Sequence, residues 1–270
     1  MKFKSLLLLI FFFEISFSQP SNYINPEGSK ICTRFLLPNS YIRSTENENS
    51  FGYFLRNLNL KPDGSIVKYH NGSQKTAKNV YDAVIDLEIG KKDLHQCADA
   101  VMRLRADYLF GQKRSSDIHF NFTNGFRVDY NQWRNGNRIV IVGDKTSWQL
   151  KSKPSDSYES YWNYLETIFS YAGTASLEKE LKTARINEIQ IGDIFIKGGF
   201  PGHAVIVVDV AINPKNNRKL FLLAQSYMPA QELQVLKNPK NPMISPWYEL
   251  TASDLQTPEW TFSASQLKRF

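Results

Sequence analysis

The feature that most constrains this chain is residues 203–210 (HAVIVVDV), a run dominated by β-branched side chains. Such a run is typical of a strand buried inside a sheet. Turn-forming residues flank it at 197–202 (KGGFPG) and 213–218 (NPKNNR). Apolar segments lie on either side, at 191–196 (IGDIFI) and 219–227 (KLFLLAQSY). We therefore predict a meander of three antiparallel strands in this part of the chain.

Helical patterns come mostly before this meander. Residues 93–110 (DLHQCADAVMRLRADYLF) repeat apolar side chains at helical spacing, and Asp93 with Gln96 three residues later has the spacing of a capping box. Further helices are predicted at 50–58, 158–171 and 176–181, and further strands at 65–69, 120–130 and 138–142, while 80–87 could be either. The stretch 237–270 is expected to wrap the body as ordered loop. The predicted fold class is α+β, with N-terminal helices packed on an antiparallel C-terminal sheet.

The first 18 residues resemble a secretory signal peptide. Lys2 and Lys4 precede the apolar run 6–13 (LLLLIFFF), which is too short to span a bilayer, and small residues precede a cut after Ser18. A retained membrane anchor is the alternative. We predict a signal peptide at 1–18, a flexible N-terminal arm at 19–30 and a single globular domain at 31–270. The mature protein is expected to be exported, periplasmic or extracellular, without an integral membrane segment.

The overall charge narrows the classes of partner. Lys and Arg number 33 against 26 Asp and Glu, a formal net charge of +7, and the basic residues are scattered. An exported basic protein suits an anionic environment such as cell-wall polymer, whereas nucleic acid is not expected without a basic stripe. The histidines show no metal-ligand spacing, and no glycine-rich loop fits a phosphate. Neither a metal nor a cofactor is predicted.

Three polar residues stand out as candidates for catalysis. Cys97 lies near the start of the predicted helix, where backbone N–H groups favour a thiolate. His203 opens the central strand, directly after the glycine-rich turn, and a symmetric hairpin about 211–220 brings it near residue 228. Gln225 or Ser226 on the next strand could then orient the imidazole, as the third residue of a triad does.

The surroundings of these residues suggest a substrate site as well. The Cys97 backbone N–H would stabilise an oxyanion, Gln96 could add a side-chain donor, and Gly202 leaves room for a substrate chain. Ser226 is the remaining candidate for substrate binding. The alternatives are that Cys97 is a buried structural residue, that His203 is an ordinary hydrogen-bonding residue, or that Cys97 pairs with Cys32 in a disulfide.

This order of a helix-borne Cys, a strand-borne His and a polar residue on the next strand resembles papain-like cysteine hydrolases. It is most similar to the NlpC/P60 and CHAP group of cell-wall amidases and endopeptidases, where a Gly-Asp pair opens the strand before the catalytic His, as Gly192 and Asp193 do here. The sequence departs from that group in the 90 or more residues between Cys97 and His203 and in the Gln96-Cys97-Ala98 start of the helix. The resemblance implies a papain-like core with Cys97 as nucleophile, His203 as base and Gln225 as orienting group.

Over most of its length the chain also resembles an exported bacterial family known as domain of unknown function 4846. The segments that carry this resemblance are SFGYFLR (50–56), QCADAVMRLRADYLF (96–110), FNFTNGF (120–126), YAGTASLEKEL (171–181), GHAVIVVD (202–209), LLAQSYMPAQE (222–232), SPWY (245–248) and TPEWTF (257–262). The resemblance implies one domain over about 30–270 and implies no activity.

Two functions remain open from the sequence. The first is a cysteine amidase or peptidase that cleaves cell-wall or envelope peptide bonds. The alternative is a non-catalytic envelope protein that binds glycan or a protein partner through exposed aromatic residues such as Trp133, Trp148 and Trp247.

Overall fold

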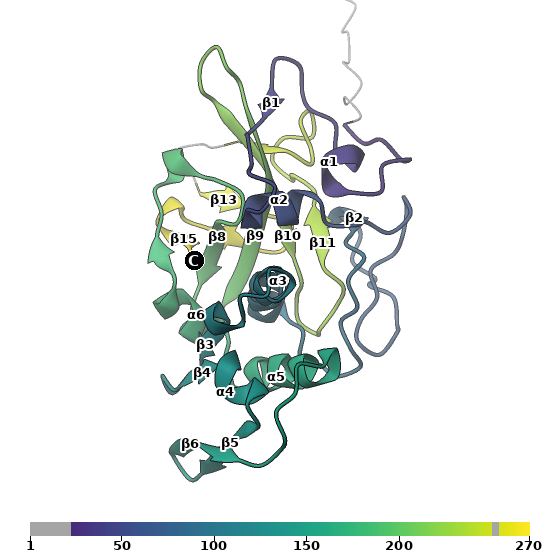
Figure 1. The fold of residues 1–270 in the computed structure, drawn as a ribbon. Coiled ribbons are helices and arrows are strands. Elements are labelled where there is room, and N and C mark those ends of the chain that lie inside the picture. The colour runs from purple at the N-terminus through teal and green to yellow at the C-terminus, as the bar shows by residue number, and fades with distance from the viewer. Residues whose placement is uncertain (1–22, 250–253) are drawn as a thin grey trace, which may run out of the picture.

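The predicted meander forms the centre of a nine-stranded antiparallel sheet in the computed structural model (Figure 1). Its strands are β8 (Ile194–Lys197), β9 (His203–Ile212) and β10 (Lys219–Gln225). The structure describes residues 23–249 and 254–270, so the predicted signal peptide lies outside the described residues. The strand order is β2-β11-β10-β9-β8-β15-β7, with β1 also paired to β9 and β12 to β10.

The remaining elements surround this sheet. The other sheet strands are β1 (Ile42–Arg43), β2 (Tyr81–Val84), β7 (Lys182–Thr183), β11 (Gln234–Leu236), β12 (Tyr248–Glu249) and β15 (Leu267–Arg269). The helices are α1 (Ile31–Arg34), α2 (Phe51–Arg56), α3 (Cys97–Gly111), α4 (Tyr130–Arg134), α5 (Tyr158–Tyr171) and α6 (Thr174–Glu180). Short 3-10 turns lie at Ser115–Asp117, Ile186–Glu188 and Ala264–Gln266. Three separate hairpins consist of β3 (His119–Asn121) with β4 (Arg127–Asp129), β5 (Asn137–Val142) with β6 (Lys145–Leu150), and β13 (Leu255–Gln256) with β14 (Thr261–Phe262).

The β-branched residues of β9 are buried because both faces of the sheet are covered. Nine of its ten residues are buried, from His203 to Ala211. Helices α2 and α3 lie over one face (Figure 1). Phe262 of β14 approaches the other side, with its ring 6.0 Å from that of Phe195 in β8. The α+β class is confirmed, with helices from the first two thirds of the chain packed on a sheet drawn largely from the last third.

The register of the central hairpin agrees with its predicted symmetry only at the turn end. Leu220 pairs with Ala211, as expected, but the register shifts between Leu222 and Leu223. Beyond this bulge Ala224 pairs with Ile206. The extra residue cannot be read from the alternation of apolar side chains, because all positions here are buried.

Helix α3 begins at Cys97, four residues later than predicted. Asp93 does not cap it. The Gln96 backbone N–H donates instead to Asp99 Oδ2 at 3.0 Å. Asp99, the third residue of the helix, therefore accepts from the backbone of Gln96, the residue directly before the helix. Cys97 is therefore the first helical residue, where backbone N–H groups are not used within the helix.

The other helices agree closely with their sequence patterns, and several strands do not. Ser50 caps α2 by accepting from the Tyr53 N–H at 3.0 Å, and α5 has the predicted bounds. The strand predicted at 65–69 is wrong, because this segment makes only isolated bridges. The strand predicted at 120–130 is two short strands joined by a turn. The C-terminal stretch is more than a loop, since β15 pairs with both β7 and β8.

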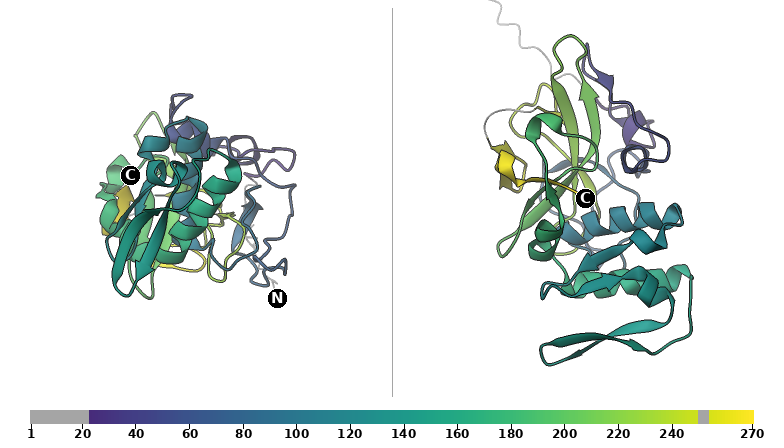
Figure 2. Two further views of the ribbon diagram at one scale, coloured as in Figure 1. Left: turned by 60° about the horizontal axis from the view of Figure 1, so that its bottom comes forward. Right: turned by 60° about the vertical axis from the view of Figure 1, so that its left-hand side comes forward.

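Two peripheral parts of the structure complete the fold. Residues 23–30 run beside α1, with a bridge between Ile24 and Phe35. The β5–β6 hairpin extends away from the sheet, beyond α5 (Figure 2). In the described ranges, no helix combines the length and apolar character needed to cross a membrane.

Candidate functional site

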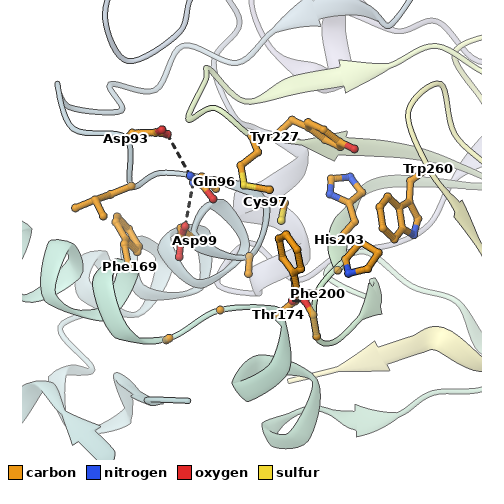
Figure 3. Close-up of a pocket in the computed structure, with 18 residues that line it drawn as sticks. Asp93, Gln96, Cys97, Asp99, Phe169, Thr174, Phe200, His203, Tyr227 and Trp260 are labelled. Atoms are coloured by element: carbon orange, nitrogen blue, oxygen red, sulfur yellow. Dashed lines mark hydrogen bonds between the residues drawn. The ribbon is translucent and has the colours of Figure 1, made fainter. Parts of the chain in front are cut away.

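A pocket of about 400 Å³ opens where α3 begins against the edge of β9 (Figure 3). The loop between β8 and β9 and the start of α6 complete its walls. Its lining residues are Asp93, Leu94, Gln96, Cys97, Ala98, Asp99, Phe169, Ala172, Gly173, Thr174, Gly199, Phe200, Pro201, Gly202, His203, Tyr227, Met228 and Trp260. The structure therefore brings Cys97 and His203, more than 100 positions apart in sequence, to one cavity.

Cys97 contributes its thiol from the first residue of α3. The side chain is half-buried and not disulfide-bonded, so the Cys32–Cys97 disulfide considered from the sequence is wrong. Cys32 lies elsewhere, with its Sγ 3.7 Å from Asn57 Oδ1. The backbone N–H of Ala204, next to His203, acts on the Cys97 sulfur and stabilises its charged form.

The environment of Cys97 nevertheless favours the neutral thiol. Burial raises the pKa of Cys97 to about 11, and the nearby Asp99 carboxylate adds to this shift. The N–H groups of Ala98, Ala204 and Cys97 itself oppose it. The expectation that the helix start makes Cys97 a thiolate is thus wrong for the resting protein, because desolvation outweighs the helix N-terminus.

His203 is held in one orientation by a chain of hydrogen bonds behind the pocket. Its Nε2 lies 2.8 Å from Gln225 Oε1. Gln225 Nε2 donates to Glu259 Oε2 at 2.6 Å, and the Lys75 ammonium lies 2.8 Å from the same oxygen. A carboxylate can only accept, so Glu259 fixes which end of the Gln225 amide faces the imidazole. Gln225 then presents its carbonyl oxygen, Nε2 of His203 carries the proton, and Nδ1 keeps its lone pair.

The imidazole is kept neutral as well as oriented. Its side chain is buried, and aromatic rings surround it, with centroids 4.7 Å away in Tyr227, 5.4 Å in Trp260 and 5.9 Å in Phe262. Burial lowers the pKa of His203 to about 4, the bond with Gln225 opposes this shift, and the Lys75 ammonium adds to it. At neutral pH the pocket therefore holds a neutral thiol and a neutral base.

Gly202 and Gln96 lie in the pocket wall, as the substrate-binding hypothesis requires. A Cβ on Gly202 would come within 2.4 Å of the Gly199 carbonyl and 2.5 Å of Thr174 Oγ1, so only glycine fits between these neighbours. Gln96 Nε2 donates to Asp93 Oδ1 at 3.1 Å, which leaves one amide hydrogen of that group. Phe200 lies at the rim with 94% of its side chain exposed.

Ser226 is not brought to this site. It is fully buried, outside the pocket lining, and its hydroxyl lies 2.7 Å from the Gln231 carbonyl and 2.9 Å from the His95 carbonyl. Successive residues of a strand point to opposite sides, so Gln225 and Ser226 cannot both reach His203. Of the two candidates for the orienting residue, Gln225 makes the contact.

Two of the three tryptophans expected on the surface are in the core. Trp247 is fully buried and Trp133 is 6% exposed. Trp148 is half-buried, with its ring 6.2 Å from that of Phe126. The expectation of an exposed aromatic surface is wrong for Trp133 and Trp247, since both pack among other apolar side chains.

Three polar residues of the site were missed in the sequence. Glu259 holds Gln225, Lys75 pairs with Glu259, and Asp99 lines the pocket beside Cys97. Glu259 does fall within TPEWTF (257–262), one of the segments that carry the family resemblance, so a signal for it was present. Across the described residues, no group of three or more His, Cys, Asp or Glu side chains is arranged to hold a metal ion.

Comparison with known families places the chain in one of them. The family model for domain of unknown function (4846) matches residues 31–269, so the chain belongs to this family. No curated protein and no solved structure matches it. The resemblance to the NlpC/P60 and CHAP group receives no support from these comparisons.

Proposed function

We propose that this protein is a cysteine hydrolase of amidase or peptidase type, acting on peptide bonds of the cell wall or envelope. The observation that carries the proposal is the bond between His203 Nε2 and Gln225 Oε1, 2.8 Å long, beside a pocket that Cys97 shares. Because the Gln225 amide binds Nε2 of the imidazole, Nδ1 is free to accept a proton, as in a Cys-His-amide triad.

The chemistry follows from the two neutral groups. His203 Nδ1 takes the proton of the Cys97 thiol as the sulfur attacks the substrate carbonyl carbon. The oxyanion that forms lies at the start of α3, where the Cys97 backbone N–H can stabilise it. The imidazolium gives its proton to the leaving amine, and the C–N bond breaks to leave a thioester. Water, deprotonated by His203, then hydrolyses the thioester and restores the thiol.

The choice of cell-wall or envelope substrates rests on the charge of the protein and on the walls of the pocket. The basic charge and the export signal expected from the sequence favour an anionic polymer outside the cytoplasm. The pocket is open and has aromatic and glycine-rich walls, which suits an extended peptide. The competing function is glycan or protein binding through exposed tryptophans. It is less well supported, because Trp133 and Trp247, two of its three residues, are buried in the core.

The experiment is digestion of isolated cell-wall peptides, with mass spectrometry to detect new amino termini. The wild-type protein is expected to release them, and Cys97→Ser and His203→Ala to reduce release by at least about 100-fold. Cys32→Ser is the matched control, because Cys32 lies outside the pocket, and should keep full activity. Equal release by wild type and Cys97→Ser would overturn the proposal.

A further inference from the structure

Asp99 carries a carboxylate oxygen that has no hydrogen-bond partner among the described residues. The side chain is 6% exposed and lines the pocket that contains Cys97 and His203 (Figure 3). Its Oδ2 accepts from the Gln96 backbone N–H at 3.0 Å, whereas its Oδ1 is buried and makes no hydrogen bond within 23–249 and 254–270. Buried polar atoms are almost always satisfied, so an orphan oxygen at a pocket wall points to a ligand.

Helix capping does not explain this carboxylate. The capping contact uses one oxygen only, and an uncharged Ser, Thr or Asn can supply such an acceptor. The helix N-terminus favours negative charge near Asp99 but gives Oδ1 no partner. The second oxygen of this carboxyl group, inside an aromatic-walled cavity, remains unexplained.

The charged residues that line the pocket indicate the charge of the ligand. Neither Lys nor Arg occurs among the described residues that line it, whereas two carboxylates, Asp93 and Asp99, do. Asp93 is already satisfied, since its Oδ1 accepts from the Ala230 N–H at 2.7 Å and from the Gln96 side chain at 3.1 Å. Arg103, one turn along α3, is occupied by Asp107 at 3.2 Å and by the Glu88 carbonyl. No Lys or Arg side chain among the described residues of the pocket is therefore available to pair with Asp99.

We propose that Asp99 binds a protonated amino group of the substrate, close to the bond that Cys97 attacks. This inference rests on the proposed function and narrows its substrates to peptides or amides with a free amine near the cleaved bond. Because Asp99 lies near the Cys97 thiol, binding of an ammonium group to Asp99 would also change the pKa of Cys97. The Asp99 carboxylate disfavours a thiolate at Cys97, and a bound ammonium would offset that charge and favour attack only when substrate is present.

The test compares three thiol reagents of different charge on Cys97 in the Cys32→Ser background. The probes are 2-aminoethyl (cationic), methyl (neutral) and 2-sulfonatoethyl (anionic) methanethiosulfonate, used at about pH 8, where the amine is still largely protonated. In each reaction the Cys97 sulfur displaces methanesulfinate and forms a mixed disulfide. Each rate constant is divided by that of the same reagent with free cysteine, which removes intrinsic reactivity.

The wild-type pocket should prefer the cationic over the neutral reagent by about tenfold or more, because a charged hydrogen bond in a buried site is strong. Asp99→Asn should abolish this preference while its amide still accepts from Gln96. Asp93→Asn is the matched control, since it removes the other carboxylate of the pocket and should keep most of the preference.

A second measurement does not depend on any Asp99 variant. The dipeptide amide Ala-Ala-NH2 should protect Cys97 of the wild-type protein from iodoacetamide better than its N-acetyl derivative does. Equal protection by both peptides, or equal cation preference in wild type and Asp99→Asn, would overturn the inference. Failure of the proposed function is distinguishable, because it appears as iodoacetamide labelling that does not depend on His203.

Discussion

Two of the buried aspartates, Asp209 and Asp99, lie on elements that pack against each other but have opposite surroundings. Asp209 on β9 is fully buried and meets two arginines, with Arg56 Nε 2.7 Å from Oδ1 and Arg43 Nε 2.8 Å from Oδ2. The Val210 N–H adds a third contact at 2.8 Å. Asp99 on α3 is almost as buried, but among the described residues it pairs with no cation and its Oδ1 accepts no hydrogen bond.

The two carboxyl groups differ in whether the described structure supplies a positive charge beside them. Asp209 ties β1 and α2 to the central strand, and the fold supplies everything that its charge needs. Burial raises the pKa of Asp99 to about 8, since no positive charge compensates for desolvation. A buried carboxyl group that lowers stability at neutral pH is consistent with the binding role proposed for Asp99.

The largest effect is expected at the paired site. Asp209→Ala leaves two arginines beside an uncompensated cavity, so the free energy of unfolding should fall by about 3–5 kcal/mol. Urea denaturation followed by circular dichroism measures it. Asp117→Ala is the control, because the exposed Arg114–Asp117 pair should contribute less than about 1 kcal/mol. A loss at Asp209 no larger than in this control would show that the paired site is not structural.

The opposite result is expected at the unpaired site. Because the folded-state pKa of Asp99 is raised, its contribution to stability is present at low pH and is lost as pH rises toward about 8. Asp99→Asn removes this dependence, so between pH 6 and 8 the variant should gain about 2 kcal/mol relative to wild type. Urea denaturation at several pH values measures the gain. If Asp99→Asn shows no gain in the free energy of unfolding relative to wild type between pH 6 and 8, the contrast with Asp209 would not hold.

A similar contrast distinguishes two buried histidines. His203 is held by Gln225, whereas His95 is fully buried with neither ring nitrogen hydrogen-bonded in the described structure. Burial lowers the pKa of His95 to about 3, and the Arg103 charge adds to the shift. Stability tied to such a group is present above pH 6.5 and is lost as pH falls toward the folded pKa.

His95→Leu should therefore flatten the acid limb of the stability curve. Between pH 6.5 and 5 the wild-type protein should lose about 2 kcal/mol more than the variant. The check is thermal or urea unfolding at each pH, with His119→Leu as the control, because that ring is only partly buried. Identical acid limbs for His95→Leu and wild type would contradict this assignment.

The smallest effect is expected behind the pocket. Glu259→Gln keeps the shape of the side chain but can present a donor to the Gln225 amide, so the His203 orientation becomes less defined. Alkylation of Cys97 at neutral pH should slow by about threefold to tenfold. Glu249→Gln, at a surface ion pair with Arg218, should leave the rate unchanged. A Glu259→Gln rate equal to that of wild type would remove Glu259 from the positioning chain.

The sequence was a good guide where one pattern dominated. The β-branched run of β9, the two turns beside it and the α5 periodicity led directly to the observed elements. Cys97 and His203 line one pocket and Gln225 contacts His203, while their roles in catalysis remain a proposal. The start of α3 was misplaced because Asp93 and Asp99 both offer a capping side chain, and only the folded chain decides between them.

The electrostatics of the site could not be predicted from local sequence. The sign of the Cys97 pKa shift depends on how deeply β9 and Tyr227 bury the thiol, and on an acid two residues away whose partner is missing. Glu259 accepts from Gln225 and from Lys75, which lies more than 180 positions away from Glu259 in the sequence. Long-range burial of this kind leaves no periodic signal along the chain.

The central claim is that His203 acts as a base toward Cys97, and the pH profile of Cys97 alkylation tests it most directly. In the Cys32→Ser background, iodoacetamide should modify wild-type Cys97 at a rate that is nearly constant from pH 5 to 8, because His203, with its pKa of about 4, is already neutral there. In His203→Ala only the rare thiolate reacts, so with a thiol pKa of about 11 the rate should be lower and rise about tenfold per pH unit. Identical profiles for the two proteins, or a Cys97 that reacts only after denaturation, would contradict the account.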